Sequence, residues 1–221
     1  MTLFVVATPI GNLEDITLRA VTVLKEVNVI AAEDTRQTRR LLEKYSIKTP
    51  SVSVHQHTQP EKLEQLMARL RRGEDIALVS DAGTPNVADP GGKLVELARR
   101  EDIKIVPIPG PSAVTTILSV AGIPTDSFMF VGFLPKKKGR QTLLRELEKL
   151  AVPIVLFESP NRVLKTLGEL RQFLGNRDVI IGRELTKLHE EILKLSLDDA
   201  ILYFNQHSPR GEFVMVITPD L

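Results

Sequence analysis

The chain of 221 residues contains no cysteine and no tryptophan. The lack of cysteine excludes disulfide bonds and thiolate-ligated metals, and it fits a reducing compartment. Aromatic residues make up only 5% of the chain, so aromatic platforms for stacking single-stranded nucleic acids are scarce. No apolar run approaches the length of a membrane span, and no charged region precedes the short apolar N-terminus as in a signal peptide. We therefore expect a cytoplasmic protein without a membrane segment.

Positive and negative charges nearly balance, since the chain has 29 Lys and Arg and 28 Asp and Glu. This balance does not by itself indicate a nucleic-acid-binding protein, although it leaves room for a local basic patch. Several common motifs are missing: the Walker A loop, the GxGxxG fingerprint, the GxSxG elbow and HExxH. His55 and His57 lie two residues apart but lack a nearby carboxylate, so we expect no metal site.

What the chain does contain is a regular alternation of apolar and amphipathic segments. This alternation predicts α/β architecture with mostly parallel sheets covered by helices. Proline and glycine are dense near residues 110–125, so we predict two α/β domains, 1–113 and 114–221, with a cleft between them. Strands are predicted at 3–7, 29–32, 51–55, 76–80, 104–108, 128–133, 154–157, 179–184 and 213–218, and helices at 35–44, 93–100, 112–120, 142–150, 163–174 and 197–205, with others within 13–27 and 58–73.

The most specialised loop follows the predicted strand at 76–80 and reads VSDAGTPNVADPGG. Its glycines permit positive φ and close backbone approach, while Pro85 and Pro90 stiffen its turns. A strand, a rigid loop of small residues and then a helix is how α/β proteins expose backbone groups to a small ligand. A plain structural turn is the simpler explanation, and we favour ligand binding over it.

Further unusual loops, TPIGN, AAEDTR, PGPSA, FESPNR and RELTK, also follow predicted strands. Ligands of α/β sheets bind at the carboxyl ends of strands, so these loops indicate one shared site. Three charged clusters within them are candidates for chemistry, although helix capping and solvated ion pairs explain them equally well. The clusters are Glu33 with Asp34 and Arg36, Glu158 with Arg162, and Arg183 with Glu184 and Lys187.

A basic loop follows the predicted strand at 128–133. Lysine-rich loops often serve solubility, but such a loop can also hold phosphates, and we favour contact with a polyanion. The basic residues of this loop are Lys136, Lys137, Lys138 and Arg140, and Arg36, Arg39 and Arg40 are expected to extend the basic surface from the first domain.

Taken in order, these loops resemble the tetrapyrrole methylase superfamily, S-adenosylmethionine (SAM) methyltransferases with two α/β domains around a cleft. The resemblance covers nearly the whole chain through TPIGNLEDIT, AAEDTRQT, SDAGTPNVADPG, PIPGPSA, GFLPKKKGR, FESPNRV and RELTKLHEE. TPIGN stands where the tetrapyrrole enzymes carry a GxGPGD-like loop, which favours the RNA-modifying subgroup. The resemblance then implies methylation of the ribose 2′-hydroxyl of a cytidine, with 16S rRNA or the small ribosomal subunit as partner. A SAM-dependent enzyme acting on a tetrapyrrole or another small molecule is the alternative.

The resemblance also implies that SAM folds into the cleft and is held largely by backbone groups. For the chemistry, we expect Glu33 or Asp34 to accept the proton of the ribose hydroxyl, with Glu184 as the reserve candidate. Arg36, Arg162 and Lys187 are expected to hold neighbouring phosphates. The residues implied in SAM binding are Thr8, Pro9 and Gly11 on one side, Asp81, Ala82, Gly83 and Thr84 around the amino-acid or ribose portion, Ser112 and Ala113 as flanks, Phe157 and Leu185 as apolar walls, and Gly211, Glu212 and Phe213 at the adenine.

Longer members of this subgroup carry a basic C-terminal extension, whereas this sequence ends at Leu221, after the last predicted strand. We therefore expect either a short member, or RNA binding through the basic loops and a second subunit. A cytidine in folded rRNA must be splayed out to enter the cleft, and two basic surfaces, one per domain or one per subunit, could do that. For that reason we predict a homodimer.

Overall fold

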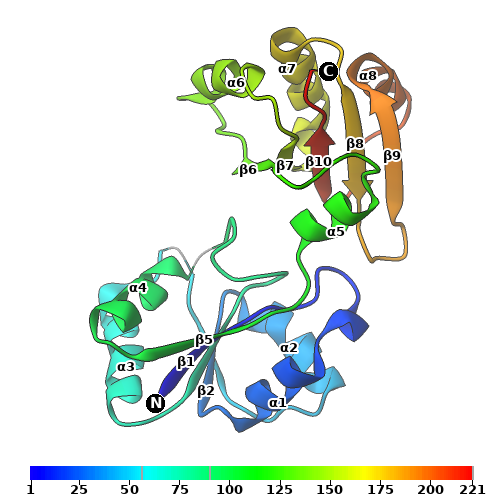
Figure 1. The fold of residues 1–221 in the computed structure, drawn as a ribbon. Helices are drawn as coiled ribbons and strands as arrows, with labels where there is room; N and C mark the ends of the chain where they lie inside the picture. Colours follow the sequence, from blue (N-terminus) through cyan, green and yellow to red (C-terminus); the bar gives the residue numbers. More distant parts are fainter. Residues whose placement is uncertain (56, 90, 221) are drawn as a thin grey trace. The chain divides into compact units, whose positions relative to one another are not determined.

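The computed structural model describes residues 1–55, 57–89 and 91–220, so Pro90, expected to stiffen the glycine-rich loop, lies outside the described residues. By their internal contacts the residues form two compact units, Met1–Ser112 and Ala113–Leu221 (Figure 1). Each unit contains one five-stranded sheet with helices packed on it. None of the described helices combines the length and apolar character needed to cross a bilayer.

Unit 1 alternates strands and helices along the chain. The strands are β1 (Thr2–Val6), β2 (Val29–Ala32), β3 (Ser51–Ser53), β4 (Ile76–Val79) and β5 (Lys104–Ile108), and the helices are η1 (Leu13–Asp15), α1 (Leu18–Glu26), α2 (Thr35–Lys44), α3 (Pro60–Arg71) and α4 (Gly92–Arg100). All strand pairs are parallel, in the order β3-β2-β4-β1-β5, which confirms the expectation for this unit. Every residue of β2 and β4 is buried, as in parallel strands covered on both faces.

Each face of this sheet buries its own core. Helices α1 and α2 cover one face, where Leu24 and Leu41 pack with Ile30 (Figure 1). Helices α3 and α4 cover the other, where Met67 and Leu94 are fully buried. The neighbouring strands β1 and β4 therefore lead into helices on opposite faces, and the loops that follow them diverge at the carboxyl edge. In α/β sheets such a divergence is the usual place for a ligand.

Unit 2 contains a mixed sheet in the order β6-β7-β10-β8-β9. Only β6 and β7 run parallel, so the expectation of mostly parallel pairing is wrong for this sheet. Residues 184–190 join β8 to β9, and so short a segment cannot make the crossover that parallel strands need. The elements are α5 (Ala113–Val120), β6 (Met129–Phe133), α6 (Arg140–Glu148), β7 (Ile154–Glu158), η2 (Pro160–Arg162), α7 (Val163–Leu174), β8 (Asp178–Arg183), β9 (Glu191–Ser196), α8 (Leu197–Gln206) and β10 (Phe213–Ile217).

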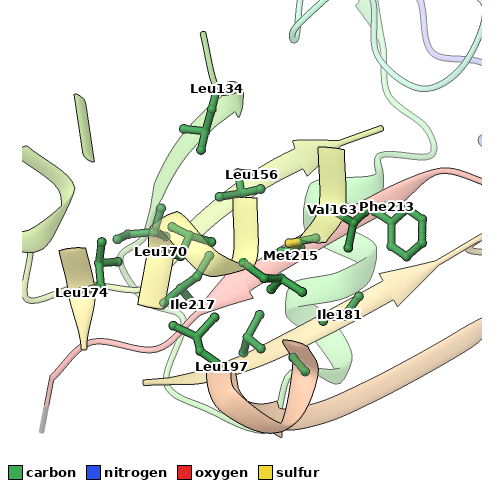
Figure 2. Packing of buried hydrophobic residues seen from close by; sticks show 14 of the residues in the cluster. Leu134, Leu156, Val163, Leu170, Leu174, Ile181, Leu197, Phe213, Met215 and Ile217 are labelled. Atoms are coloured by element: carbon green, nitrogen blue, oxygen red, sulfur yellow. The ribbon is translucent and has the colours of Figure 1, made fainter. Parts of the chain in front are cut away.

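The core of unit 2 lies between its sheet and helices α6, α7 and α8. Figure 2 shows Leu156 and Met215 of the sheet beside Leu170 of α7, all fully buried. On the opposite face, α5 packs against β10. A Cβ atom at Gly182 would lie 2.9 Å from Cδ1 of Ile117, so the missing side chain makes room for α5.

Candidate functional site

Backbone hydrogen bonds join the loops after β1 and β4 at the carboxyl edge of unit 1. The Thr8 N–H donates to the Gly83 carbonyl at 2.9 Å, and the Gly83 N–H donates to the Thr8 carbonyl at 3.0 Å. The Thr8 hydroxyl donates to the Ser80 carbonyl at 3.1 Å. Gly83 has φ of +77°, a conformation that favours glycine. Two residues implied in SAM binding are thereby fixed against each other.

The loop after β5 reaches the same edge. A Cβ atom at Gly110 would lie 3.0 Å from the Cβ atom of Ala7, so a side chain there would push this loop away from the loop after β1. The Thr84 hydroxyl lies 3.5 Å from the Pro111 carbonyl, directly before Ser112. Of the other predicted residues of unit 1, Pro9 is buried, whereas Gly11, Asp81 and Ala82 are exposed.

Three carboxylates from two loops meet at this edge. The Asp34 N–H donates to Oδ1 of Asp81 at 2.9 Å, and the Asp81 N–H donates to Oε2 of Glu33 at 3.5 Å. Burial, together with the charge of Asp81, raises the pKa of Glu33. Burial also raises the pKa of Asp81, despite the hydrogen bond from the Asp34 N–H. Across the described ranges, no three His, Asp or Glu side chains gather closely enough to hold a metal ion.

Asp34 differs from its two neighbours because Arg36 neutralises it. The Arg36 guanidinium donates from Nε to Oδ1 at 3.1 Å and from Nη2 to Oδ2 at 2.7 Å. These bonds, with the Arg36 N–H, lower the pKa of Asp34 to about 2. The same carboxylate is the N-cap of α2, which confirms the capping role offered by the sequence as an alternative to chemistry.

Asp89 joins this acidic group, although the sequence did not single it out. Burial raises the pKa of Asp89 to about 6, reinforced by the charge of Asp81 and partly offset by a hydrogen bond from Ser80. The loop that carries Asp89 holds Asn86 at φ +72° and Ala88 at φ +65°. Non-glycine residues adopt this conformation at a cost, and such strain is concentrated at functional loops.

The raised pKa of Asp89 makes a prediction about stability. An unfolded Asp has a pKa of roughly 3.9, against about 6 in the folded protein. Between these values the folded state binds more protons, so the free energy of unfolding falls as pH rises through this window. We expect Asp89→Asn to remove that fall in the free energy of unfolding. The gain in stability of the variant over the wild type should be smallest near pH ~4 and reach its full size above pH ~7. Thermal unfolding across pH measures it, and a variant that gains nothing at high pH contradicts the raised pKa.

Unit 2 holds a lysine between two carboxylates after β8. Oε1 of Glu184 accepts hydrogen bonds from Nζ of Lys187 and from the Glu212 N–H, both at 2.9 Å. Nζ of Lys187 also donates to Oε2 of Glu212 at 2.9 Å. Burial alone would raise the pKa of Glu184, but these hydrogen bonds outweigh it and lower the pKa. Burial alone would lower the pKa of Lys187, and the two carboxylates raise it instead.

The backbone around this ion pair is strained. Glu184 has φ of +50° and Thr186 has φ of +66°, and the buried Thr186 hydroxyl finds no hydrogen-bond partner among the described residues. Gly211, with φ of +84°, lies so close to Glu184 that a Cβ atom would overlap the glutamate side chain. Strain of this kind persists where the surrounding structure enforces it, typically at functional sites. The structure therefore brings together four predicted residues: Glu184, Lys187, Gly211 and Glu212.

The apolar residues predicted to lie near SAM differ in how deeply they are buried. Leu185 is buried, and its Cδ2 atom lies close to Gly182. Phe213 packs against Phe204 with ring centroids 5.6 Å apart, inside the core covered by the helices. Its side chain therefore belongs to this core, and its role at the adenine stays a prediction. Phe157 on β7 is partly exposed, and Ala113 begins α5.

Two arginines of unit 2, Arg140 and Arg162, form hydrogen bonds and ion pairs within that unit. Nε of Arg162 lies 3.2 Å from Oε1 of Glu158, and Nη2 of Arg162 donates a hydrogen bond to the Leu134 carbonyl at 2.6 Å. Arg140 is only 4% exposed and donates to two side chains of α7 and to the Pro135 carbonyl. The expectation that Arg140 belongs to an exposed basic surface is wrong, because a buried guanidinium must satisfy its donors internally.

Comparison with known proteins identifies relatives along nearly the whole chain. The family described as "Tetrapyrrole (Corrin/Porphyrin) Methylases" matches residues 2–201. The "Ribosomal RNA small subunit methyltransferase I" of Thermotoga maritima is 46% identical over 98% of this chain and 97% of its own length. The protein of the same name from Synechocystis is 48% identical over 99% of this chain and 80% of its own length.

Solved structures agree in fold. A cobalt precorrin-4 methyltransferase of cobalamin biosynthesis has a TM-score of 0.75 at 19% identity, covering 98% of this chain and 94% of that one. A uroporphyrin-III-C-methyltransferase from Thermus thermophilus has a TM-score of 0.67 at 19% identity, with the same coverage. The match over residues 2–201 and relatives above 45% identity along the chain lead to one conclusion: the chain belongs to the tetrapyrrole methylase family.

Proposed function

We propose that the chain is a SAM-dependent methyltransferase that modifies the ribose 2′-hydroxyl of a cytidine in 16S rRNA, acting in the cytoplasm. The observation that carries the proposal is its 46% identity, over 98% of the chain, to the rRNA small subunit methyltransferase I of Thermotoga maritima. The tetrapyrrole methyltransferases share the fold at only 19% identity. A tetrapyrrole acceptor is therefore the weaker alternative.

The carboxyl edge of unit 1 fits SAM, whose sulfonium and ammonium groups are positively charged. Gly83 and Gly110 allow the loops after β1, β4 and β5 to approach one another closely, which holds this edge of the sheet in one geometry. The carboxylates of Glu33, Asp81 and Asp89 favour positive charge nearby. When bound, SAM supplies an activated methyl group, which leaves the protein to bind, orient and exclude water.

The acceptor hydroxyl must lose its proton, and the carboxylates differ in their fitness to receive it. Burial raises the pKa of Glu33, whereas Arg36 holds the pKa of Asp34 at about 2. The ion pair with Lys187 lowers the pKa of Glu184 despite its burial. We therefore assign the proton to Glu33.

Exposed cations support an RNA substrate. Arg36, Arg39 and Arg40 are exposed on α2 in unit 1, and the loop after β6 adds exposed lysines in unit 2. Arg36 and Lys187 are proposed to orient the ribose and its phosphates, whereas Arg162 links segments of unit 2. Large exposed side chains such as Leu18 (88%) and Leu188 (93%) are compatible with a homodimer, which we retain in the proposal.

The direct test uses labelled SAM and small ribosomal subunits from cells that lack the activity. We expect methylation of one cytidine ribose at its 2′-oxygen, located by mapping the modified nucleotide. SAM binding is measured separately by calorimetry. Intact SAM binding with no labelled ribose, or with label on a tetrapyrrole instead, would reject the RNA substrate.

The proton acceptor is tested by single-turnover methylation at saturating SAM. Glu33→Ala is expected to slow the reaction about 100-fold or more, as for other general bases. Asp34→Ala and Glu184→Ala should slow it less, because both carboxylates are already engaged by cations. Full activity in all three variants would remove the general base from the mechanism.

Gly211 and Gly175 form a matched pair for testing the strained loop of unit 2. Both have positive φ, +84° and +79°, but a Cβ atom at Gly175 would meet nothing within 4 Å. Gly175, with φ of +79° and ψ of −171°, has a conformation essentially restricted to glycine, so we expect Gly175→Ala to cost about 1–3 kcal/mol of stability from backbone strain alone. Gly211→Ala should cost about 1–3 kcal/mol more, because the new methyl group displaces Glu184. Urea unfolding measures both, and equal losses would show that the contact with Glu184 is unimportant.

A further inference from the structure

Strand β6, at the edge of the second sheet, carries an exposed aromatic side chain. Phe133 is 54% exposed although it is a large apolar residue. Its ring packs edge-on against Phe157, with centroids 5.7 Å apart, and Phe157 contacts Phe130 in the same way at 5.0 Å. The exposed ring is therefore supported by Phe157, which Phe130 supports in turn. Exposed apolar surface of this kind commonly marks a binding site.

Three consecutive lysines follow Phe133 closely in the sequence. Lys136, Lys137 and Lys138 are all exposed. Within the described part of the chain, none of them forms an ion pair or hydrogen bond through its side chain. Their positive charges are thus left without a local counter-charge, beside a ring that water solvates poorly. A polyanion with aromatic groups has the complementary chemistry.

Arg140 and Arg162 hold the backbone between the ring and the lysines. Arg162 donates to the Leu134 carbonyl at 2.6 Å, and Arg140 donates to the Pro135 carbonyl at 3.1 Å. Glu158, which is fully buried, pairs with Arg162 in turn. The base of the lysine loop is thus anchored to the core of unit 2, which reduces the ordering cost of binding.

We propose that Phe133 and Lys136–Lys138 form a docking surface for single-stranded RNA, which we call the Phe133–lysine surface. A base stacks on the Phe133 ring while the lysines contact successive phosphates. Stacking on an aromatic ring next to a basic track is how proteins hold single strands without reading their sequence. The inference rests on the proposed function, because the strand that docks is rRNA next to the modified nucleotide.

The test measures binding of a fluorescent single-stranded RNA, with the 16S sequence around the modified ribose, at several salt concentrations. Phe133→Ala should weaken binding about tenfold, the loss typical of one stacked base, without changing the salt dependence. Phe133→Tyr should restore the affinity. Replacing Lys136, Lys137 and Lys138 together by Gln should reduce the slope of log K against log salt by about 2, because each phosphate contact on a single strand contributes about 0.7.

Matched controls lie elsewhere on unit 2. Leu202→Ala removes an apolar side chain that is 60% exposed, and Lys149→Gln removes an exposed charge, so neither should change RNA binding. The lysine variant and the two controls should bind SAM like the wild type in calorimetry, because the residues they change lie outside those proposed to hold it.

The outcomes separate this inference from the proposed function. If the wild type methylates small subunits and the Phe133 and lysine variants bind RNA unchanged, the docking surface is wrong and the function stands. If the variants lose RNA binding as expected but the wild type modifies no ribose, the function fails and the docking surface stands. If Phe133→Ala instead converts a sedimenting dimer to a monomer, the ring belongs to a contact between two copies and the RNA proposal is overturned.

Discussion

Parallel pairing of the strands in unit 1 is the constraint on which its candidate site depends. It brings the residues that follow β1, β2, β4 and β5 to one edge of the sheet. Glu33 and Asp81 lie 48 positions apart in the sequence and meet only because β2 and β4 are parallel neighbours. The reciprocal hydrogen bonds of Thr8 and Gly83 then fix two diverging loops against each other. Backbone groups make this bridge, and it depends on Gly83, whose φ of +77° favours glycine.

The sequence predicted those elements whose signal is local. The helices at Thr35–Lys44 and Val163–Leu174 were predicted with their bounds, the first because Asp34 caps its start and the second because it buries a regular apolar stripe. Strand β9 was missed because it lies at a sheet edge, where Ile192 stays 42% exposed and the alternation is weak. The insertion of β10 between β7 and β8 is a pairing of distant segments, and no local pattern encodes it.

The features of the candidate site also divide into those with a local signal in the sequence and those that only the folded chain creates. Loop composition was enough to single out the loops after β1 and β4, because glycine and small polar residues after a strand are typical of ligand-binding loops. The roles of Thr8, Asp81 and Gly83 within those loops came from the family resemblance and stay predictions. The raised pKa of Asp89 depends on burial and on Asp81, which only the folded loop brings near. Arg140 looked like part of a basic run, yet partners on α7 bury it. Charge patterns in a sequence therefore indicate ionic character but not which charges face water.

A net charge of +1 conceals an uneven distribution of charge. Acidic groups gather at the carboxyl edge of unit 1, whereas exposed cations gather on α2 and in the loop after β6. The acidic groups repel one another, and burial raises the pKa of Glu33, Asp81 and Asp89 alike. A cationic ligand at this edge would relieve that repulsion and favour the ionised carboxylates, so its binding and their loss of protons are coupled. The proposed polyanionic substrate has the opposite requirement, since positive charge attracts it and the acidic edge repels it.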